Sequence, residues 1–259
     1  MTAKRNFSRE LDQIAESARQ QGYAPTLLLQ ACCAPCSSAC LERLREDFRV
    51  TVYYYNPNIT DSAEYTKRKA EEGRLIAELN RQVEEQDFAF PYPLSAEEDG
   101  HSTLAADHPE LLRAMHSTSR AHRIDILEAP YDPERFLSMA KGMEELPEGG
   151  ARCFACYALR LRQTAEAALS GGFDYFSTTL TISPLKNADR LNEIGEKIAE
   201  KLREEDTPEA PRFLPSDFKK KNGYLRSIQL SHEFGLYRQN YCGCEFSRRQ
   251  AEEKQAGRM

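Results

Sequence analysis

Residues 27–36, with the sequence LLLQACCAPC, decide how the rest of the chain is arranged. The apolar residues at the start form a run as long as a buried β-strand, and three cysteines follow at once. The other cysteines lie far away in the sequence, as Cys153-Phe-Ala-Cys156, Cys242-Gly-Cys244 and the single Cys40. We therefore predict that thiols from three distant segments meet in one redox or metal site.

The composition is that of a water-soluble domain. A chain of 259 residues with 40% hydrophobic and 29% charged residues can form one large domain with additions. No run approaches the roughly 20 apolar residues that a membrane span needs, and the charged start MTAKRNFSRELDQ does not resemble a secretory signal. We therefore expect a cytoplasmic protein without a membrane partner, in which eight cysteines serve metal binding or catalysis.

The net charge of −6 argues against nonspecific binding of nucleic acid over the whole surface. A local basic patch is compatible with this charge. Lys67-Arg68-Lys69, Lys219-Lys220-Lys221 and Arg248-Arg249 would form such a patch if the fold brought them together, and otherwise they are solvated helix faces.

The pattern around the first cysteines predicts a parallel sheet. Residues 26–31 are expected to form a buried strand, 37–47 a helix, and 50–55 (VTVYYY) a second strand, which together make a β-α-β unit. The same alternation continues, with helices at 61–80, 132–145, 153–170, 188–205 and 224–234 and after residue 244, and strands at 123–129, 173–179 and 213–214. The predicted class is α/β, with a doubly wound parallel sheet.

The domain organisation follows from the same pattern. We expect an N-terminal helical extension over residues 1–25, one α/β catalytic domain over 26–250, and a tail over 251–259. Residues 81–121 are polar and weakly patterned, and they are interpreted as an insertion or lid in that domain.

The cysteines stand where an α/β sheet binds ligands. Cys32 and Cys33 directly follow the first strand, and such sheets bind ligands outside the carboxyl ends of their strands. Cys153 and Cys156 begin a predicted helix, whose free N–H groups stabilise thiolates. Seven cysteines in three groups exceed the four ligands of a zinc site, although a zinc site of four cysteines remains an alternative. Cys40 is expected to be an inert packing residue.

The pair Cys242-Gly-Cys244 has two interpretations. A disulfide between these residues would close a very small ring, so it would be strained and easily reduced. Such a pair suits electron transfer more than stability, and we favour that interpretation. Ligation of a metal is the alternative.

Five blocks in order carry a resemblance to a known family: QACCAPC, YYYNPNI with EYTKRKAE, ARCFACYALRL, YFSTTLTISPLKN and LYRQNYCGCEFS. Together they resemble the QueH-type epoxyqueuosine reductases, from about residue 27 to 249 apart from the insertion. The resemblance implies an oxidoreductase that reduces epoxyqueuosine to queuosine at the wobble position of tRNA. It also implies a nucleotide-hydrolase-like three-layer fold, related to PP-loop enzymes, with C-terminal helices.

The resemblance also implies the cofactor and its ligands. A [4Fe-4S] cluster would be bound by Cys32, Cys33, Cys153 and Cys156, and Cys242 with Cys244 would form a redox-active disulfide. Cys36 is a candidate ligand for a second, mononuclear metal. The expected partners are tRNA carrying epoxyqueuosine and an unidentified electron donor.

Polar and aromatic residues near the cysteines are the expected substrate contacts. Asn56 and Asn58 could form hydrogen bonds with the cyclopentane diol of the substrate. Ser177, Thr179 and Lys186 could contact a phosphate or ribose, and Tyr241 could stack on a base. The expected contacts are Asn56, Asn58, Ser177, Thr179, Lys186, Asn187, Arg238 and Tyr241.

Two other functions fit parts of the pattern. An ATP-dependent iron–sulfur tRNA thiolation enzyme would share the cysteines, but no Gly-rich SGGxDS-like loop follows the first strand, which argues against use of ATP. A zinc-binding RNA-interaction module would share the cysteine spacing without being an enzyme.

Overall fold

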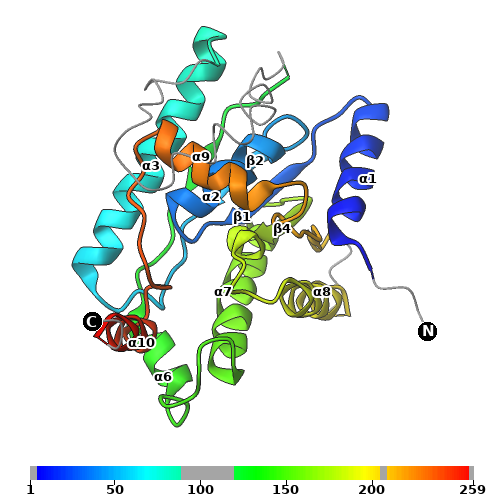
Figure 1. The fold of residues 1–259 in the computed structure, drawn as a ribbon. Coiled ribbons are helices and arrows are strands. Elements are labelled where there is room, and N and C mark those ends of the chain that lie inside the picture. Colours follow the sequence, from blue (N-terminus) through cyan, green and yellow to red (C-terminus); the bar gives the residue numbers. More distant parts are fainter. Residues whose placement is uncertain (1–4, 89–119, 205–208, 257–259) are drawn as a thin grey trace.

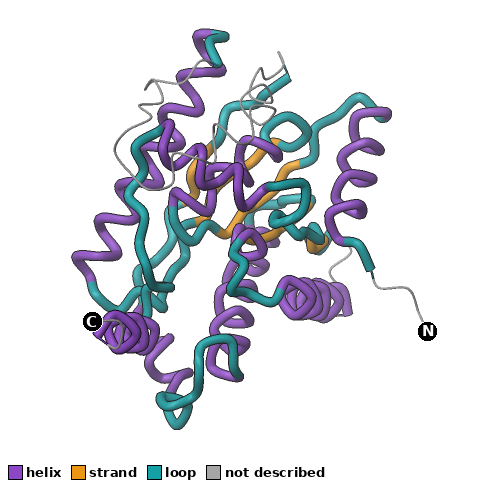
Figure 2. Tube along the Cα trace, viewed as in Figure 1, coloured by secondary structure: helices purple, strands orange, loops and turns teal. Residues whose placement is uncertain are grey.

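A five-stranded parallel sheet forms the centre of the protein (Figures 1 and 2). The structure is a computed structural model that describes residues 5–88, 120–204 and 209–256. Within them the strand order is β3-β2-β1-β4-β5, and every pair is parallel. The strands are β1 (Thr26–Gln30), β2 (Arg49–Tyr53), β3 (Asp125–Leu127), β4 (Tyr175–Thr178) and β5 (Arg212–Phe213). The predicted parallel α/β class is confirmed.

Helices cover both faces of the sheet and complete a three-layer arrangement (Figure 1). Because side chains alternate along a strand, Leu27 and Leu29 enter one core and Leu28 enters the other. The first core is closed by α1 (Phe7–Gln20), α2 (Ala34–Leu44), α3 (Ser62–Glu85) and α9 (Gly223–Glu233). The second core is closed by α7 (Ala151–Ser170) and α8 (Ala188–Glu204).

Three shorter elements complete the chain around the carboxyl edge of the sheet. A 3₁₀ helix, η1 (Thr179–Ile182), continues directly from β4. The helices α6 (Pro133–Ala140) and α10 (Glu245–Ala256) share a small third core in which Phe136 and Phe246 pack with Cys156 and Cys244. The C-terminal helices expected from the sequence are therefore present, and α10 lies beside two of the candidate site cysteines.

The central strand β1 is buried because strands flank it on both sides and hydrophobic cores cover both of its faces. Leu28 is paired with Thr51 of β2 and with Phe176 of β4, and it is fully buried. Burial of a leucine side chain contributes about 1.5–3 kcal/mol. Consequently Cys32 and Cys33, which follow β1, are attached to a firmly packed strand.

Three helices differ from the predicted bounds by three residues or more. The helix expected over 37–47 spans Ala34–Leu44, so Cys36 lies inside it. The helix expected to end near Asn80 continues to Glu85, because Arg81 pairs with Glu78 and Glu85 along its polar face. The helix after Asp132 ends at Ala140 instead of near Glu145, and Gly142 follows in the left-handed region at φ +81°.

The domain boundaries stay predictions. Most of the proposed insertion, residues 89–119, and the last residues of the proposed tail lie outside the described residues. The helix α1, assigned to an N-terminal extension, places Leu11 and Ala15 in the same core as Leu27 and Leu29.

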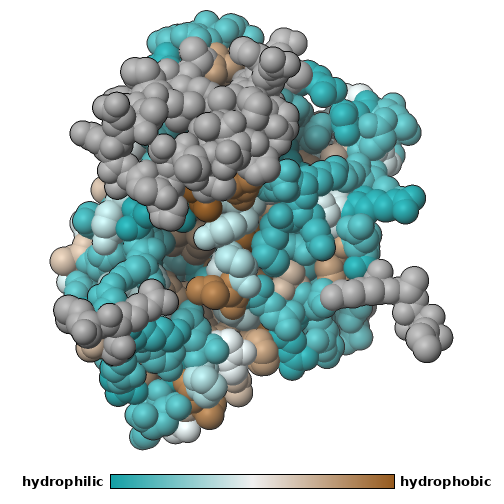
Figure 3. All heavy atoms as spheres, in the orientation of Figure 1, coloured by the Kyte–Doolittle hydropathy of each residue, from teal (hydrophilic) through white to brown (hydrophobic). Residues whose placement is uncertain are grey.

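On the side viewed in Figure 3 the described surface is mostly hydrophilic, as expected when the hydrophobic residues are buried between the layers. Hydrophobic surface is exposed near the middle of this side. Among the described helices, none has both the length and the apolar character needed to cross a membrane.

Candidate thiol-rich functional site

The carboxyl ends of β1, β2 and β4 bring three loops to one edge of the sheet. Because these strands are parallel, Cys32, Asn56 and Thr179 follow them at the same edge. The backbone N–H of Cys32 donates to Oγ1 of Thr179 over 3.2 Å, and that hydroxyl donates to the Cys32 sulfur over 3.4 Å. The first cysteine is thus fixed between two strands.

Three thiols form a close cluster at the start of α2. The sulfurs of Cys32, Cys33 and Cys36 all lie within 4.8 Å of one another, and those of Cys32 and Cys33 are 3.8 Å apart. Cys33 is the N-cap residue of α2, so the unpaired N–H groups of the helix start face this cluster. Three thiols at this separation can bind one metal ion.

The three thiols of this cluster differ in their pKa. Hydrogen bonds from Cys33 and Cys36 hold the pKa of Cys32 well below its usual range, and the positive charges of Lys186 and Arg160 act in the same direction. The same hydrogen bond with Cys32 raises the pKa of Cys33 to about 12. Cys32 is therefore the thiol of this cluster that ionises first.

The second group of thiols comes from α7 and from the loop before α10. Cys153, Cys156, Cys242 and Cys244 line one small cavity of about 20 Å³, roughly the space of a single water molecule. Burial raises the pKa of Cys156 to about 12. The backbone N–H of Gly149 donates to the sulfur of Cys153 over 3.3 Å.

Cys242 connects the two groups. It lines the small cavity, and it also lines a larger one of about 310 Å³ whose wall includes Cys32, Cys33 and Cys36. The structure therefore brings thiols from all three distant segments to one place. All eight cysteines are free thiols, and Cys40 is fully buried one helical turn beyond Cys36.

The C-terminal cysteine loop is held in place by α3. Arg68, which is 2% exposed, pairs with Glu64 over 2.6 Å and donates to the carbonyl oxygen of Cys242 over 3.3 Å. The same guanidinium lies 4.9 Å from the ring centre of Tyr241. The loop thus takes its position from a buried ion pair on a rigid helix.

Two positive charges face the thiols. Arg160 is buried beside Cys156, and Lys186 is half-buried, with Cys242, Cys32 and Cys36 as the groups that would act most strongly on its charge as thiolates. Among the described residues, no carboxylate pairs with either side chain. The site thus carries positive charge that thiolates or a bound anionic group can balance.

Four of the expected substrate contacts are buried and already hydrogen bonded. Asn56 bonds to the carbonyl oxygen of Ala31 and to Arg160. The side-chain amide of Asn58 donates to the carbonyl oxygen of Cys242 over 3.5 Å. The hydroxyl of Ser177 donates to the carbonyl oxygen of Leu214, and Thr179 contacts Cys32 as described above. Their contact with substrate stays a prediction.

The other four expected contacts are more accessible. Lys186, Arg238 and Tyr241 line the larger cavity. Asn187 instead accepts a hydrogen bond from the backbone N–H of Arg190 and caps α8. The cavity therefore brings together three of the eight residues on walls that a ligand can reach.

Several residues of the site were not identified from the sequence. Glu148 lines both cavities, Arg160 is buried one helical turn after Cys156, and Glu72 is buried on α3 without lining either cavity. For Arg160 a signal was available, because it lies one helical turn after Cys156 and so shares its face of α7. For Glu72 the signal was its place among the buried positions Leu75, Ile76 and Leu79 of α3.

The basic runs do not form one patch. Arg68 is buried, whereas Lys69 pairs with Glu128 at the surface. Lys221 pairs with Asp12 of α1, and Arg249 pairs with Glu145. Most of these charges are therefore neutralised locally.

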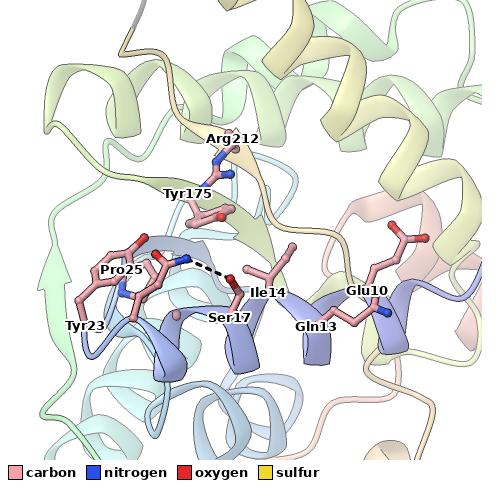
Figure 4. Close-up of a pocket in the computed structure, with 10 residues that line it drawn as sticks. Glu10, Gln13, Ile14, Ser17, Tyr23, Pro25, Tyr175 and Arg212 are labelled. Carbon is pink, nitrogen blue, oxygen red and sulfur yellow. Dashed lines mark hydrogen bonds between the residues drawn. The ribbon is translucent and has the colours of Figure 1, made fainter.

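A larger cavity lies away from the thiols. Figure 4 shows its lining, in which Ile14 and Ser17 of α1 face Tyr175 and Arg212 across a space of about 520 Å³. Tyr175 and Arg212 begin β4 and β5, so this cavity lies at the amino edge of the sheet, opposite to the cysteines. It belongs to the packing of α1 and not to the thiol site.

The fold and the site together define a class of protein. A parallel three-layer α/β sheet that carries reduced cysteines at its carboxyl edge is a scaffold for metal or redox chemistry, and Cys32, Cys33 and Cys36 are close enough to bind a metal.

Comparisons with known proteins identify the family. The family model described as epoxyqueuosine reductase QueH matches residues 27–98 and 106–250. A protein named epoxyqueuosine reductase QueH from Streptococcus pyogenes is 33% identical over 94% of this chain and 78% of its own length. The protein of that name from Staphylococcus epidermidis is 34% identical over 94% and 85%, and the one from Thermotoga maritima is 29% identical over 89% and 94%. The chain belongs to the QueH family, and the predicted family and oxidoreductase class are confirmed.

Proposed function

We propose that this protein reduces epoxyqueuosine to queuosine at the wobble position of tRNA, in the cytoplasm. The observation that carries the proposal is the position of Cys242, which stands in the wall of both thiol-lined cavities. Family membership supports the substrate, because the relatives are named as reductases of epoxyqueuosine.

The residues of the site suit an iron–sulfur centre. Thiolates are the ligands of such clusters, and the unpaired charges of Arg160 and Lys186 suit a group with negative charge. We assign Cys32, Cys33, Cys153 and Cys156 as ligands of a [4Fe-4S] cluster. Cys36, whose sulfur lies within 4.8 Å of those of Cys32 and Cys33, stays the candidate ligand of a second, mononuclear metal. When bound, the cluster supplies single electrons.

The reaction requires two electrons and two protons. Both carbon–oxygen bonds of the epoxide break, a carbon–carbon double bond forms, and the oxygen leaves as water. The thiols of Cys242 and Cys244 can supply both electrons and both protons, and they then form a disulfide. An electron donor of the cell must afterwards return this disulfide to two thiols, which closes the cycle.

The larger cavity is the proposed place for the modified base. Its volume of about 310 Å³ lies at the lower end of the range found for small-molecule sites. Tyr241 offers an aromatic face at its wall for a base that has left the anticodon stack. Arg238 and Lys186 supply positive charge for the neighbouring phosphate groups.

One measurement tests the substrate. Nucleosides from the tRNA of cells that lack this protein should contain epoxyqueuosine in place of queuosine when analysed by mass spectrometry. A plasmid copy of the chain should restore queuosine, and a copy with Cys242→Ser should not. The Cys40→Ala copy is the matched control, because Cys40 is buried away from both cavities. Normal queuosine in the deletion strain would contradict the proposal.

A second measurement separates an iron–sulfur enzyme from a zinc-binding RNA module. The three-thiol cluster could hold either metal. Anaerobic purification should give a brown protein with iron and with visible absorbance from sulfur-to-iron charge transfer. A colourless protein with bound zinc and no reductase activity would instead favour the RNA module.

A further inference from the structure

Arg160 is a buried cation without a carboxylate partner. It is 1% exposed and lies on α7, one helical turn after Cys156. Within the described part of the chain, no aspartate or glutamate pairs with it. An unbalanced charge in a protein interior is unfavourable, so a negatively charged group bound beside Arg160 would be stabilised by it.

A network of neutral side chains holds Arg160 in place. Its Nη2 donates to Oδ1 of Asn56 over 2.5 Å, and the Nδ2 of Asn56 donates to the carbonyl oxygen of Ala31 over 2.8 Å. Gln30 lies beside this pair and accepts a hydrogen bond from the hydroxyl of Thr178 over 2.8 Å. The network fixes the guanidinium relative to β1, β2 and β4 and adds no negative charge.

The groups that can balance Arg160 are sulfurs from all three cysteine segments. As thiolates, Cys156, Cys32 and Cys242 would be the groups that act most strongly on its charge, and its Nε has no hydrogen-bond partner. These three cysteines come from α7, from the loop after β1 and from the C-terminal loop. Arg160 is therefore a buried cation whose charge acts on sulfurs of all three segments.

We propose that Arg160 is a positioning residue whose fixed positive charge stabilises the electron-rich state of the centre bound by these thiols and so raises its reduction potential. The inference rests on the proposed function, namely on an iron–sulfur centre at these cysteines. Reduction adds one negative charge to the centre, and a buried cation nearby lowers the free energy of that state. Removal of the cation should make the centre harder to reduce.

The test is a redox titration of the iron-loaded protein under anaerobic conditions, followed by electron paramagnetic resonance. Arg160→Gln removes the charge and keeps a donor for Asn56, and Arg160→Met is a second neutral variant without a buried donor. Both should lower the equilibrium constant for one-electron reduction at least tenfold, a shift of about 59 mV to more negative potential. Arg160→Lys keeps the charge and should keep the potential close to that of the wild type.

Arg45→Met is the matched control. Arg45 is also 1% exposed with an unpaired Nε, but it lies at the opposite end of α2 from the cysteines and donates to Leu79 and Gln82. This variant should lose stability and keep the potential of the wild type. Equal potentials for wild type, Arg160→Gln and Arg160→Met would overturn the inference alone. A wild-type protein that binds no iron would overturn the proposed function as well.

Discussion

The sulfurs of Cys32 and Cys33 lie 3.8 Å apart, although the two residues are neighbours in the chain and Cys33 has extended backbone angles. Neighbouring side chains of an extended chain normally point to opposite sides. The distance equals the edge of a tetrahedron around a metal with sulfur ligands at about 2.3 Å, which is ~3.8 Å. The chain therefore turns between β1 and α2 so that both thiols lie at a separation that one metal ion could bridge.

The two cysteine pairs should respond differently to substitution. Cys153→Ser should abolish the visible absorbance and most of the bound iron, because the proposed cluster loses a ligand. Cys242→Ser should keep the iron and lose turnover, because only the dithiol is broken. Iron content and absorbance after anaerobic purification check both expectations, with Cys40→Ala as the control that keeps both. Equal loss of iron in the two serine variants would mean that Cys242 is a ligand.

Gly243 is required between the last two cysteines. Its φ of +117° suits only glycine, and a Cβ there would lie 2.8 Å from a side-chain carbon of Ile59 and 3.2 Å from Nη1 of Arg68. Gly243→Ala should displace the loop and lower kcat at least about tenfold, since small displacements at a reaction centre are costly. Gly142→Ala is the control, because its φ is also positive while nothing lies near the added carbon. Similar kcat values for the two variants would show that the contact with α3 is unimportant.

Glu72 should make the protein less stable as the pH rises. It is 2% exposed, neither carboxyl oxygen has a hydrogen-bond partner, and burial raises its pKa from 4.5 to about 8. Between these values the folded state holds a proton that the unfolded state has lost. The free energy of unfolding therefore falls by about 1.4 kcal/mol for each pH unit from pH 5 to 8, as far as this group contributes.

Denaturant unfolding of Glu72→Gln at several pH values checks this expectation. In this variant the free energy of unfolding should fall less steeply between pH 5 and 8, and at pH 8 it should exceed that of the wild type. Glu71→Gln is the matched control, because a hydrogen bond from Arg74 lowers the pKa of Glu71 and its contribution is lost only as the pH falls below the usual range. An unchanged slope in Glu72→Gln would show that the buried carboxyl is ionised.

The helix α1 should be part of the folding unit. Leu11 is 2% exposed and belongs to the core that contains Leu27. Leu11→Ala should lower the free energy of unfolding by about 2–5 kcal/mol, measured with denaturant. Leu146→Ala, at a position 37% exposed, should change it by less than about 0.5 kcal/mol. A small effect at Leu11 would mean that the segment is a separable extension.

Much of the fold could be predicted because its signals are local. The hydrophobic run before Cys32 and the alternation of strand and helix patterns are sufficient for a parallel sheet. The end of α3 could not be placed, since it depends on ion pairs of Arg81 that stabilise a polar helix end. The same limit applies to the strand at 123–129, where only Asp125–Leu127 pairs with β2.

The cysteines of the site could be predicted from the sequence, whereas its buried charged residues could not. Spacing indicated which thiols form groups. The resemblance to the family put Cys153 and not Cys36 with Cys32 and Cys33, whereas the turn into α2 places the sulfur of Cys36 within 4.8 Å of theirs. Arg160 was missed because an arginine on a helix is normally exposed. Its burial depends on Asn56, which comes from a distant strand end, and such tertiary contacts leave no trace in a single sequence.

The three groups of thiols differ in how they are supported. Cys32 follows the central strand and Cys153 lies in a long helix, whereas Cys242 is on a loop that α3 holds through Arg68. The first two groups of sulfurs therefore lie on or next to regular elements of the fold, and the third group lies on a loop that is held by side-chain contacts. A chain shortened to end before Tyr237 would keep the sulfurs that follow β1 and those on α7, and it would lose the proposed dithiol of Cys242 and Cys244.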